Sequence, residues 1–339
     1  MYVINARNPQ LALPKAIRFL NETGIPRMSR NGPVLISKEP VTTVYTHPME
    51  RVIFWPERDA NPFLHLYESL WMLSGRNDVA PLLKFAKNYK NYSDDGATIH
   101  DSYGYRWRKM FGMDQLRVVA DRLKKDPDDR RSVVQMWDAE EDLDSPSKAV
   151  PCNMIITFQR DHRGALDMVV FNRSNDIIWG CYGANVVHFS YLLEYMADAI
   201  GCPMGTYTQI SVNWHAYLET FEPVRHMTRE YDPYTLNNVH PIPMAQGFFS
   251  LGSLIKEIMT DVDTQFMRPY SSTGSPWANM VQKMLRAHHI FSNKAAPEKY
   301  IEALAILSDE DPSIDWIAAG TQWIQRRRTV WENKMGGEK

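Results

Sequence analysis

The chain is poor in cysteine and carries almost no net charge, and each shortage excludes a class of protein. Its 339 residues include three cysteines, too few for a disulfide scaffold, which predicts a reducing compartment. A formal net charge of -2 gives no general attraction to nucleic acid or to a membrane surface. No apolar run reaches the ~18 residues of a spanning helix, and the N-terminus lacks the apolar segment of a signal peptide. We therefore expect a cytoplasmic protein that binds neither nucleic acid nor membrane.

The short motifs of several nucleotide-binding and metal-binding proteins are also missing. The chain has no Walker loop, no GxGxxG and no CxxC, so nucleotide-hydrolase, Rossmann and zinc-protein hypotheses have little support. His288 and His289 are adjacent, and adjacent side chains on a helix point apart, so the pair is not a metal motif. We expect no metal site.

Proline positions and apolar spacing predict the elements. Prolines throughout the first 60 residues exclude a long helix there and favour irregular, strand-like structure. Strands are predicted over 132–137, 154–160, 166–172 and 206–212. Helices are predicted over 61–74, 79–89, 114–125, 184–200 and 215–220, and near the C-terminus over 275–291, 297–307 and 314–331. Residues 222–274 are expected to be mixed and rich in loops. Helices and strands do not alternate regularly, which favours an α+β fold.

Two predicted strands place reactive residues at the same edge of the fold. Cys152, in VPCN, precedes the β-like run MIITF, whereas Arg173 and Ser174, in FNRSND, end the β-like run LDMVVF. If these strands are neighbours, a thiol and an anion-binding pair meet at one rim. Arginine makes forked contacts to phosphate, and nearby positive charge favours the reactive thiolate. The pattern indicates covalent chemistry on a phosphorylated small molecule, although a buried cysteine is more often an inert apolar residue.

Other polar residues allow two interpretations each. Arg130 and Arg131, in DPDDRR, form either a solvated charge run or two further phosphate ligands. Asn185 begins a helical pattern, either as an N-cap or as an amide that reads the edge of a heterocycle. An amide accepts from a ring N–H and donates to a carbonyl, which suits uracil. His215 and Tyr217, in NWHAY, bind a sugar hydroxyl or belong to the core.

The order and spacing of the motifs resemble the thymidylate synthase family, including its pyrimidine hydroxymethylase branch. The matching motifs are ESLWMLSG (68–75), SYGYRWR (102–108), DPDDRRSVVQMW (126–137), VPCN (150–153), NRSND (172–176) and NWHAY (213–217). The resemblance implies an α+β fold with a mixed sheet flanked by helices, in a homodimer joined through the sheets. The resemblance covers roughly residues 30–217. We expect residues 1–339 to form a single domain of this kind, with a helical C-terminal extension from about 276–339.

The resemblance further implies a role for each matched side chain. The implied catalytic residues are the nucleophile Cys152, which attacks C6 of the pyrimidine, with Glu68, Tyr103 and Asn153 beside it. The implied substrate ligands are Arg30, Arg173 and Ser174 for the phosphate, joined by Arg130 and Arg131 of a partner subunit, with His215 and Tyr217 for the deoxyribose and Asn185 for the base. The implied folate contacts are Asp176, Tyr89 and Tyr92. The substrate would be a pyrimidine deoxynucleoside monophosphate and the cofactor 5,10-methylenetetrahydrofolate.

Three departures from the synthases favour the hydroxymethylase branch. Asn153 stands where synthases usually carry His, and Tyr89 and Tyr92 stand where they usually carry Trp. The terminal TVWENKMGGEK lacks the hydrophobic end that closes over the synthase site and excludes water.

Asn185 favours dUMP over dCMP as the substrate. Modification of free deoxynucleotides would suit a virus acting in host cytoplasm. The alternatives are a thymidylate synthase, a dCMP hydroxymethylase or methylase, a cysteine hydrolase using Cys152 and His215, and a non-catalytic nucleotide-binding or RNA-binding relative.

Overall fold

A mixed sheet forms the centre of the structure, a computed structural model that describes residues 1–244, 251–266 and 274–336. Within these residues the sheet has eight strands in the order β1-β4-β8-β7-β6-β5, and the β2–β3 hairpin joins β8 through β3. The pairs β1–β4 and β7–β8 are parallel and the other pairs are antiparallel. The strands are β1 (Tyr2–Ala6), β2 (Ile25–Ser29), β3 (Gly32–Ile36), β4 (Val41–Tyr45), β5 (Val133–Gln135), β6 (Asn153–Arg160), β7 (Leu166–Asp176) and β8 (Met204–Tyr217).

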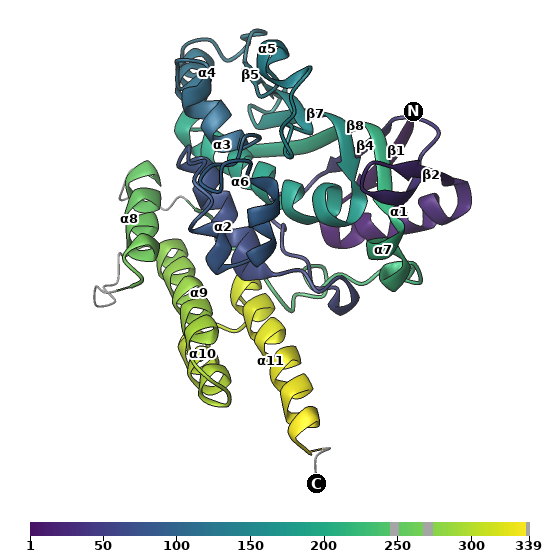
Figure 1. Ribbon diagram of the computed structural model, residues 1–339. Coiled ribbons are helices and arrows are strands. Elements are labelled where there is room, and N and C mark those ends of the chain that lie inside the picture. The colour runs from purple at the N-terminus through teal and green to yellow at the C-terminus, as the bar shows by residue number, and fades with distance from the viewer. Residues whose placement is uncertain (245–250, 267–273, 337–339) are drawn as a thin grey trace.

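Helices α2 and α6 lie below strands β7 and β8 in Figure 1, and the C-terminal helices lie farther from the sheet. The helices are α1 (Pro9–Thr23), α2 (Pro62–Leu73), α3 (Tyr103–Tyr105), α4 (Gln115–Lys125), α5 (Ala139–Asp142), α6 (Asn185–Ile200), α7 (Leu218–Phe221), α8 (Leu251–Asp263), α9 (Pro276–Asn293), α10 (Glu298–Ser308) and α11 (Asp315–Gly336). The predicted α+β class, with a mixed sheet and flanking helices, is confirmed.

The two central helices begin and end where the sequence predicts. Asn61 caps α2, because its side-chain oxygen accepts from the amides of Phe63 and Leu64 at 3.1 and 3.2 Å, and Pro62 occupies the first helical position. Gly201 ends α6 with a φ of 82°, a left-handed conformation that glycine adopts without steric cost. Because these caps fix where α2 begins and where α6 ends, they also fix which side chains of the two helices face the site.

The expectation that prolines exclude a long helix from the first 60 residues is wrong. Helix α1 contains Pro14 in its interior. Proline removes the hydrogen bond that would reach the carbonyl of residue 10, but the indole N–H of Trp55 donates to that Gln10 carbonyl at 2.9 Å. The helix also buries an apolar face that includes Leu13 and Ile17. This packing offsets the cost of the proline.

Two other predicted helices also differ in the structure. Residues 79–89 form short 3-10 turns at Leu82–Lys84 and Lys87–Tyr92 instead of a helix, and the amide of Val79 pairs with the carbonyl of Ala97. Residues 215–217 continue strand β8, and a helical turn begins only at Leu218. Tertiary pairing of the backbone overrides the local apolar spacing in both places.

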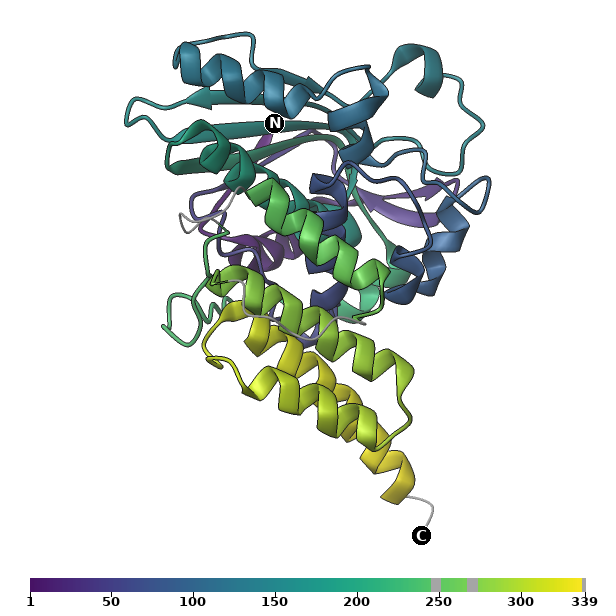
Figure 2. The same ribbon diagram turned by 90° about the vertical axis from the view of Figure 1, so that its left-hand side faces the viewer.

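The C-terminal helices dock on α2 through aromatic side chains. Phe63 on α2 lies 5.3 Å from the ring of His288 on α9 and 5.5 Å from that of Trp323 on α11. One hydrophobic cluster therefore includes the sheet, α2 and these helices. Figure 2 shows α11 leading away from the sheet toward the C-terminus. The three predicted C-terminal helices correspond to α9, α10 and α11, whereas α8 lies in the stretch expected to be loop-rich, whose residues 245–250 and 267–273 lie outside the described residues.

The face of the sheet opposite α2 and α6 carries apolar side chains that no described helix covers. Burial alternates along β7, where Met168 and Val170 are buried and Phe171 is 39% exposed. On the same face, Val212 of β8 is 61% exposed and Val133 of β5 is 43% exposed. An exposed apolar patch of this kind is typical of a protein interface. Separately, none of the helices in the described ranges has both the length and the apolar character needed to cross a membrane.

Candidate active site

The thiol of Cys152 and the guanidinium of Arg173 meet at one end of the antiparallel β6–β7 pair, as the sequence predicts. The amide of Arg173 donates to the Cys152 carbonyl at 3.0 Å, and Nη2 of Arg173 lies 3.9 Å from Cys152 Sγ. The same guanidinium donates to the carbonyls of Pro151 and Val150 at 2.8 and 3.0 Å. Arg173 therefore holds the cysteine turn as well as facing its sulfur.

Burial controls the ionisation of this thiol. Burial raises the pKa of Cys152, and the negative charge of Asp101 raises it further, whereas Arg173 and Arg30 lower it. The two arginines act in the direction that the sequence predicts but do not outweigh burial. Arg30 is exposed in the turn between β2 and β3, and its effect on the thiol places it at the same rim.

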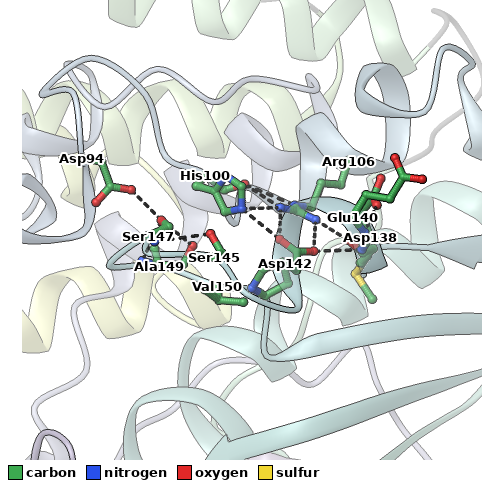
Figure 3. A network of polar contacts seen from close by, with 12 residues as sticks. Asp94, His100, Arg106, Asp138, Glu140, Asp142, Ser145, Ser147, Ala149 and Val150 are labelled. Atoms are coloured by element: carbon green, nitrogen blue, oxygen red, sulfur yellow. Dashed lines mark hydrogen bonds and ion pairs between the residues drawn. The ribbon is translucent and has the colours of Figure 1, made fainter.

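A buried ion pair anchors the loop that leads to Cys152 (Figure 3). Arg106 follows α3 and Asp142 ends α5, and neither side chain is exposed to solvent. Arg106 Nη1 donates to Asp142 Oδ2 at 2.6 Å, and Nη2 donates to Oδ1 at 2.8 Å. His100 Nε2 lies 2.9 Å from the same carboxylate. Burial alone would raise the pKa of Asp142, but its hydrogen bonds with Arg106 hold that pKa below its usual value.

A second contact fixes the other end of this loop (Figure 3). Ser147 Oγ donates to Asp94 Oδ2 at 2.6 Å, and the amide of Lys148 donates to Asp94 Oδ1 at 3.1 Å. Residues 138–150 are thus tied at both ends to residues 94–106. The loop before the nucleophile and the segment bearing the predicted catalytic tyrosine are positioned by the same contacts.

Glu68 is the centre of a buried polar cluster. The hydroxyl of Tyr89 donates to Glu68 Oε1, and His188 Nε2 lies 3.0 Å from Glu68 Oε2. Burial and the adjacent carboxylate raise the pKa of Tyr89, so its phenol stays a hydrogen-bond donor. Sequence reasoning missed His188. Its position three residues after Asn185, on the same face of α6, was the available signal.

Asp101 is a second residue that sequence reasoning missed. Burial raises its pKa to about 6, with Arg106 and His100 opposing and Glu68 reinforcing the rise. Its negative charge also raises the pKa of Cys152. The only signal in the sequence was its place two residues before the predicted catalytic tyrosine.

Asn153 and Tyr103 lie directly beside the nucleophile. The side chain of Asn153 is completely buried, and neither Oδ1 nor Nδ2 has a hydrogen-bond partner among the described residues. Burial raises the pKa of Tyr103, and hydrogen bonds from the backbone of Cys152 and Asn153 oppose that rise. Buried amides in proteins are nearly always hydrogen-bonded, so the unpaired amide of Asn153 indicates a place for a ligand or a water molecule.

Asn185 points its amide at another buried asparagine. It lies within the first turn of α6, and the cap position is Ala184, so the N-cap interpretation is wrong. Its Nδ2 donates to Asn175 Oδ1 at 3.3 Å. The side-chain oxygen of Asn185 is therefore turned away from Asn175.

Asp176 joins the end of β7 to the residues predicted to bind sugar. Its Oδ1 accepts from the amides of Ile178 and Trp179 at 2.8 and 2.6 Å, and its Oδ2 accepts from the amide of Tyr217 at 3.3 Å. Burial raises the pKa of Asp176, and the nearby His215 acts against that rise. The rings of His215 and Tyr217 are 5.2 Å apart in an edge-on arrangement.

The remaining predicted residues lie on the surface or at the margin. Ser174 lies on β7 opposite Asn213 of β8, and the ring of Tyr92, 48% exposed, is 6.2 Å from that of Tyr89. Arg130 and Arg131 are exposed just before β5, and no described contact joins them to Cys152. In the described ranges, no three His, Cys, Asp or Glu side chains are grouped to hold a metal ion.

The sequence and the fold are similar to those of known proteins. Residues 22–246 match the family model described as Thymidylate synthase. A Pseudomonas phage M6 protein named Deoxyuridylate hydroxymethyltransferase is 46% identical over 98% of this chain and 96% of its own length. A Bacillus phage SP01 protein of the same name is 39% identical over 54% of this chain and 50% of its own length. Among solved structures, thymidylate synthase from T4 phage superposes with a TM-score of 0.57 at 22% identity, covering 73% of this chain and 91% of that one, which supports the fold alone.

The site and these matches define a one-carbon transferase. The chain belongs to the thymidylate synthase family. Members of this family act on dUMP with a folate cofactor. The predicted family is confirmed.

Breaking the Arg106–Asp142 pair should destabilise the fold strongly. Asp142→Asn leaves a buried guanidinium without its counter-charge, which costs about 3–5 kcal/mol. The double variant Arg106→Met with Asp142→Leu leaves no buried charge and should lose much less. Denaturant unfolding of both variants measures the difference, and equal losses would contradict this account of the pair.

Removing the charge of Asp101 should make Cys152 more reactive. Asp101→Asn removes a negative charge that raises the thiol pKa, so alkylation by iodoacetamide at pH 7.5 should be about two- to five-fold faster. The gain should shrink below pH 6, where Asp101 is itself protonated. Peptide mapping separates Cys152 from Cys181 and Cys202. An unchanged rate at pH 7.5 would show that Asp101 does not act on the thiol.

Proposed function

We propose that this enzyme hydroxymethylates C5 of dUMP, with 5,10-methylenetetrahydrofolate as one-carbon donor and water as the source of the hydroxyl. The observation that carries the proposal is the buried Asn153 amide, which is unpaired among the described residues and adjacent to the nucleophile. An amide can both donate to and accept from a water molecule, so this residue suits a site that must hold water. The names of the two phage relatives support the same reaction.

Cys152 begins the reaction by adding to C6 of the pyrimidine. A pyrimidine C5 is a weak nucleophile, and addition of sulfur at C6 converts the ring to an enolate whose C5 can attack. The thiol must first lose its proton, and bringing it close to Arg173 favours the thiolate. Hydrogen bonds from the site to the pyrimidine O4 stabilise the charge that develops there.

The aromatic pair Tyr89 and Tyr92, together with Asp176, is proposed to hold the folate. Tyr92 is 48% exposed, and its ring lies 6.2 Å from that of Tyr89, whose hydroxyl is fixed on Glu68. The exposed ring of this pair is accessible to a planar ligand. When bound, the folate supplies a one-carbon unit for attachment to C5. Tyr89 thus connects the folate position to Glu68.

Glu68 is proposed to act as the base for water. Once the one-carbon unit is bonded to C5, loss of the C5 proton and cleavage of the bond to the folate nitrogen would leave an exocyclic methylene at C5 of the nucleotide. Water attacks this methylene carbon, Glu68 accepts the water proton, and the electron pair enters the ring. Collapse of the ring enolate breaks the C6–S bond and returns Cys152 as thiolate. The hydrogen bond from Tyr89 orients one carboxylate oxygen of Glu68, and His188 Nε2 lies 3.0 Å from the other.

Helix α11 is joined to the loop before α2. Arg326 and Arg327 of α11 bind Asp59 at 3.1 and 2.8 Å, and α11 runs away from the sheet in Figure 1. A synthase reaction needs water excluded until hydride transfer is complete, whereas a hydroxymethylase needs water at that point. Thymidylate synthesis would remain the alternative if another segment covers the site.

A second copy of the chain is proposed to cover the apolar sheet face defined by Val133, Phe171 and Val212. Burying that face would form a homodimer joined through the sheets. Arg130 and Arg131, exposed and without a described contact to their own Cys152, would then reach the phosphate site of the partner subunit. Arg30, Arg173 and Ser174 would bind that phosphate from the same chain, and His215 with Tyr217 would bind the deoxyribose hydroxyl.

The whole chain is proposed to act as one domain. The shared hydrophobic cluster joins the helices from about residue 276 onward to the sheet domain. The names of the phage relatives support action in the cytoplasm of a host cell.

The product of the reaction tests the proposed function. Purified protein incubated with dUMP and methylenetetrahydrofolate should give a nucleotide heavier by one hydroxymethyl group, without dihydrofolate. Cys152→Ala should give no product while still binding dUMP. A methylated nucleotide with stoichiometric dihydrofolate would identify a synthase, and turnover by the alanine variant would exclude the covalent route.

Asn185→Asp should shift the preference toward dCMP. A carboxyl group can pair with the exocyclic amino group of cytosine, whereas the native amide suits the N3–H and O4 of uracil. We expect the ratio of kcat/KM for dUMP over dCMP to fall by about tenfold or more, in line with the loss of one well-placed hydrogen bond. An unchanged ratio would mean that Asn185 does not read the base.

A further inference from the structure

A chain of buried amides leads from a backbone carbonyl to the base-reading residue. Its first member is Gln209, whose Nε2 donates to the Cys181 carbonyl at 2.8 Å and to the Tyr45 hydroxyl oxygen at 2.8 Å. A backbone carbonyl only accepts, and the Tyr45 hydroxyl itself donates to the same carbonyl at 3.3 Å. The nitrogen of Gln209 must therefore face these groups, and its Oε1 must face the other way.

The second member, Asn175, transmits this orientation. Its Nδ2 donates to Gln209 Oε1 at 3.3 Å and to Ser211 Oγ at 3.0 Å. With its nitrogen so placed, Asn175 presents Oδ1 at its other end, where it accepts from Asn185 Nδ2 at 3.3 Å. The direction of each amide follows from the preceding one, and the Cys181 carbonyl sets the direction of the whole chain.

Packing around the last contact is close and largely excludes solvent. Gln209 and Asn175 are 1% and 2% exposed, so water cannot replace a lost partner cheaply. A Cβ on Gly180 would lie 2.7 Å from Asn175 Oδ1 and 3.0 Å from Asn185 Nδ2. Glycine at this position therefore preserves the contact between the two asparagines.

We propose that Gln209 and Asn175 are positioning residues that select uracil by fixing the amide orientation of Asn185. With one N–H of Asn185 held by Asn175, its free oxygen accepts from the N3–H of uracil. Cytosine has an unprotonated N3, which is an acceptor and would face that oxygen without a hydrogen. This inference rests on the proposed function, because it assigns Asn185 to the base of dUMP.

The test compares two variants that each remove one partner of Asn175. Gln209→Leu removes the acceptor that fixes the direction of Asn175, because the remaining Ser211 hydroxyl can either donate or accept. Ser211→Ala removes a partner but keeps the acceptor on Gln209. The readout is the Kd for dUMP and for dCMP, measured by calorimetry without folate. We expect the dCMP/dUMP ratio of Kd values to fall about tenfold in Gln209→Leu and to stay within about twofold in Ser211→Ala.

A second pair of variants covers the case in which Gln209→Leu does not fold. Asn175→Asp keeps an oxygen facing Asn185 and should keep the preference for dUMP, whereas Asn175→Leu should lose it. Equal ratios within this pair, or a wild-type ratio in folded Gln209→Leu, would overturn the inference. A wild-type protein that binds both nucleotides equally would overturn it as well. Selective binding of dUMP without hydroxymethyl product would instead overturn the proposed function alone.

Discussion

The buried pair of Arg106 and Asp142 is the contact on which the geometry of the site depends. Cys152 lies at the end of a loop, and loops hold their shape only where side chains fix them. The pair joins that loop to the segment carrying Asp101 and Tyr103 through a bidentate contact with no solvent exposure. Taking two charges out of water is costly, so such a pair is weak evidence for stability. Here the pair acts by positioning, because it holds the loop before Cys152 next to the segment that carries Asp101 and Tyr103.

The site combines the buried thiol of Cys152 with buried polar side chains, one of which has no hydrogen-bond partner among the described residues. Burial raises the pKa of the Cys152 thiol, and the nearby arginines act against that rise. Asn153 is buried and unpaired among the described residues, Tyr89 donates to Glu68, and His188 lies beside the same carboxylate. The residues proposed as nucleophile, water ligand and base thus come from different elements of the fold, as the proposed addition and water capture require.

Part of the geometry of the site could be predicted from the sequence, and several buried residues around it could not. The β6–β7 rim, the caps of α2 and the end of α6 follow from local patterns, so Cys152 and Arg173 could be brought together in advance. Gln209 gave no such signal, because it lies in an ordinary alternating run and contacts the Cys181 carbonyl, which is distant in sequence. The one signal for His188 was its position three residues after Asn185 on α6. Helix α1 was missed because the carbonyl freed by its proline is satisfied by a remote tryptophan.

The central claim is that Cys152 forms a covalent bond to a uracil nucleotide in this site. Incubation with 5-fluoro-dUMP and methylenetetrahydrofolate tests it most directly, because fluorine at C5 cannot leave as a proton does and the reaction must stop with the nucleotide attached. Denaturing mass spectrometry followed by peptide mapping should find nucleotide and folate together on the Cys152 peptide, at one equivalent per chain. Absence of an adduct, or an adduct on Cys181 or Cys202, would contradict the account.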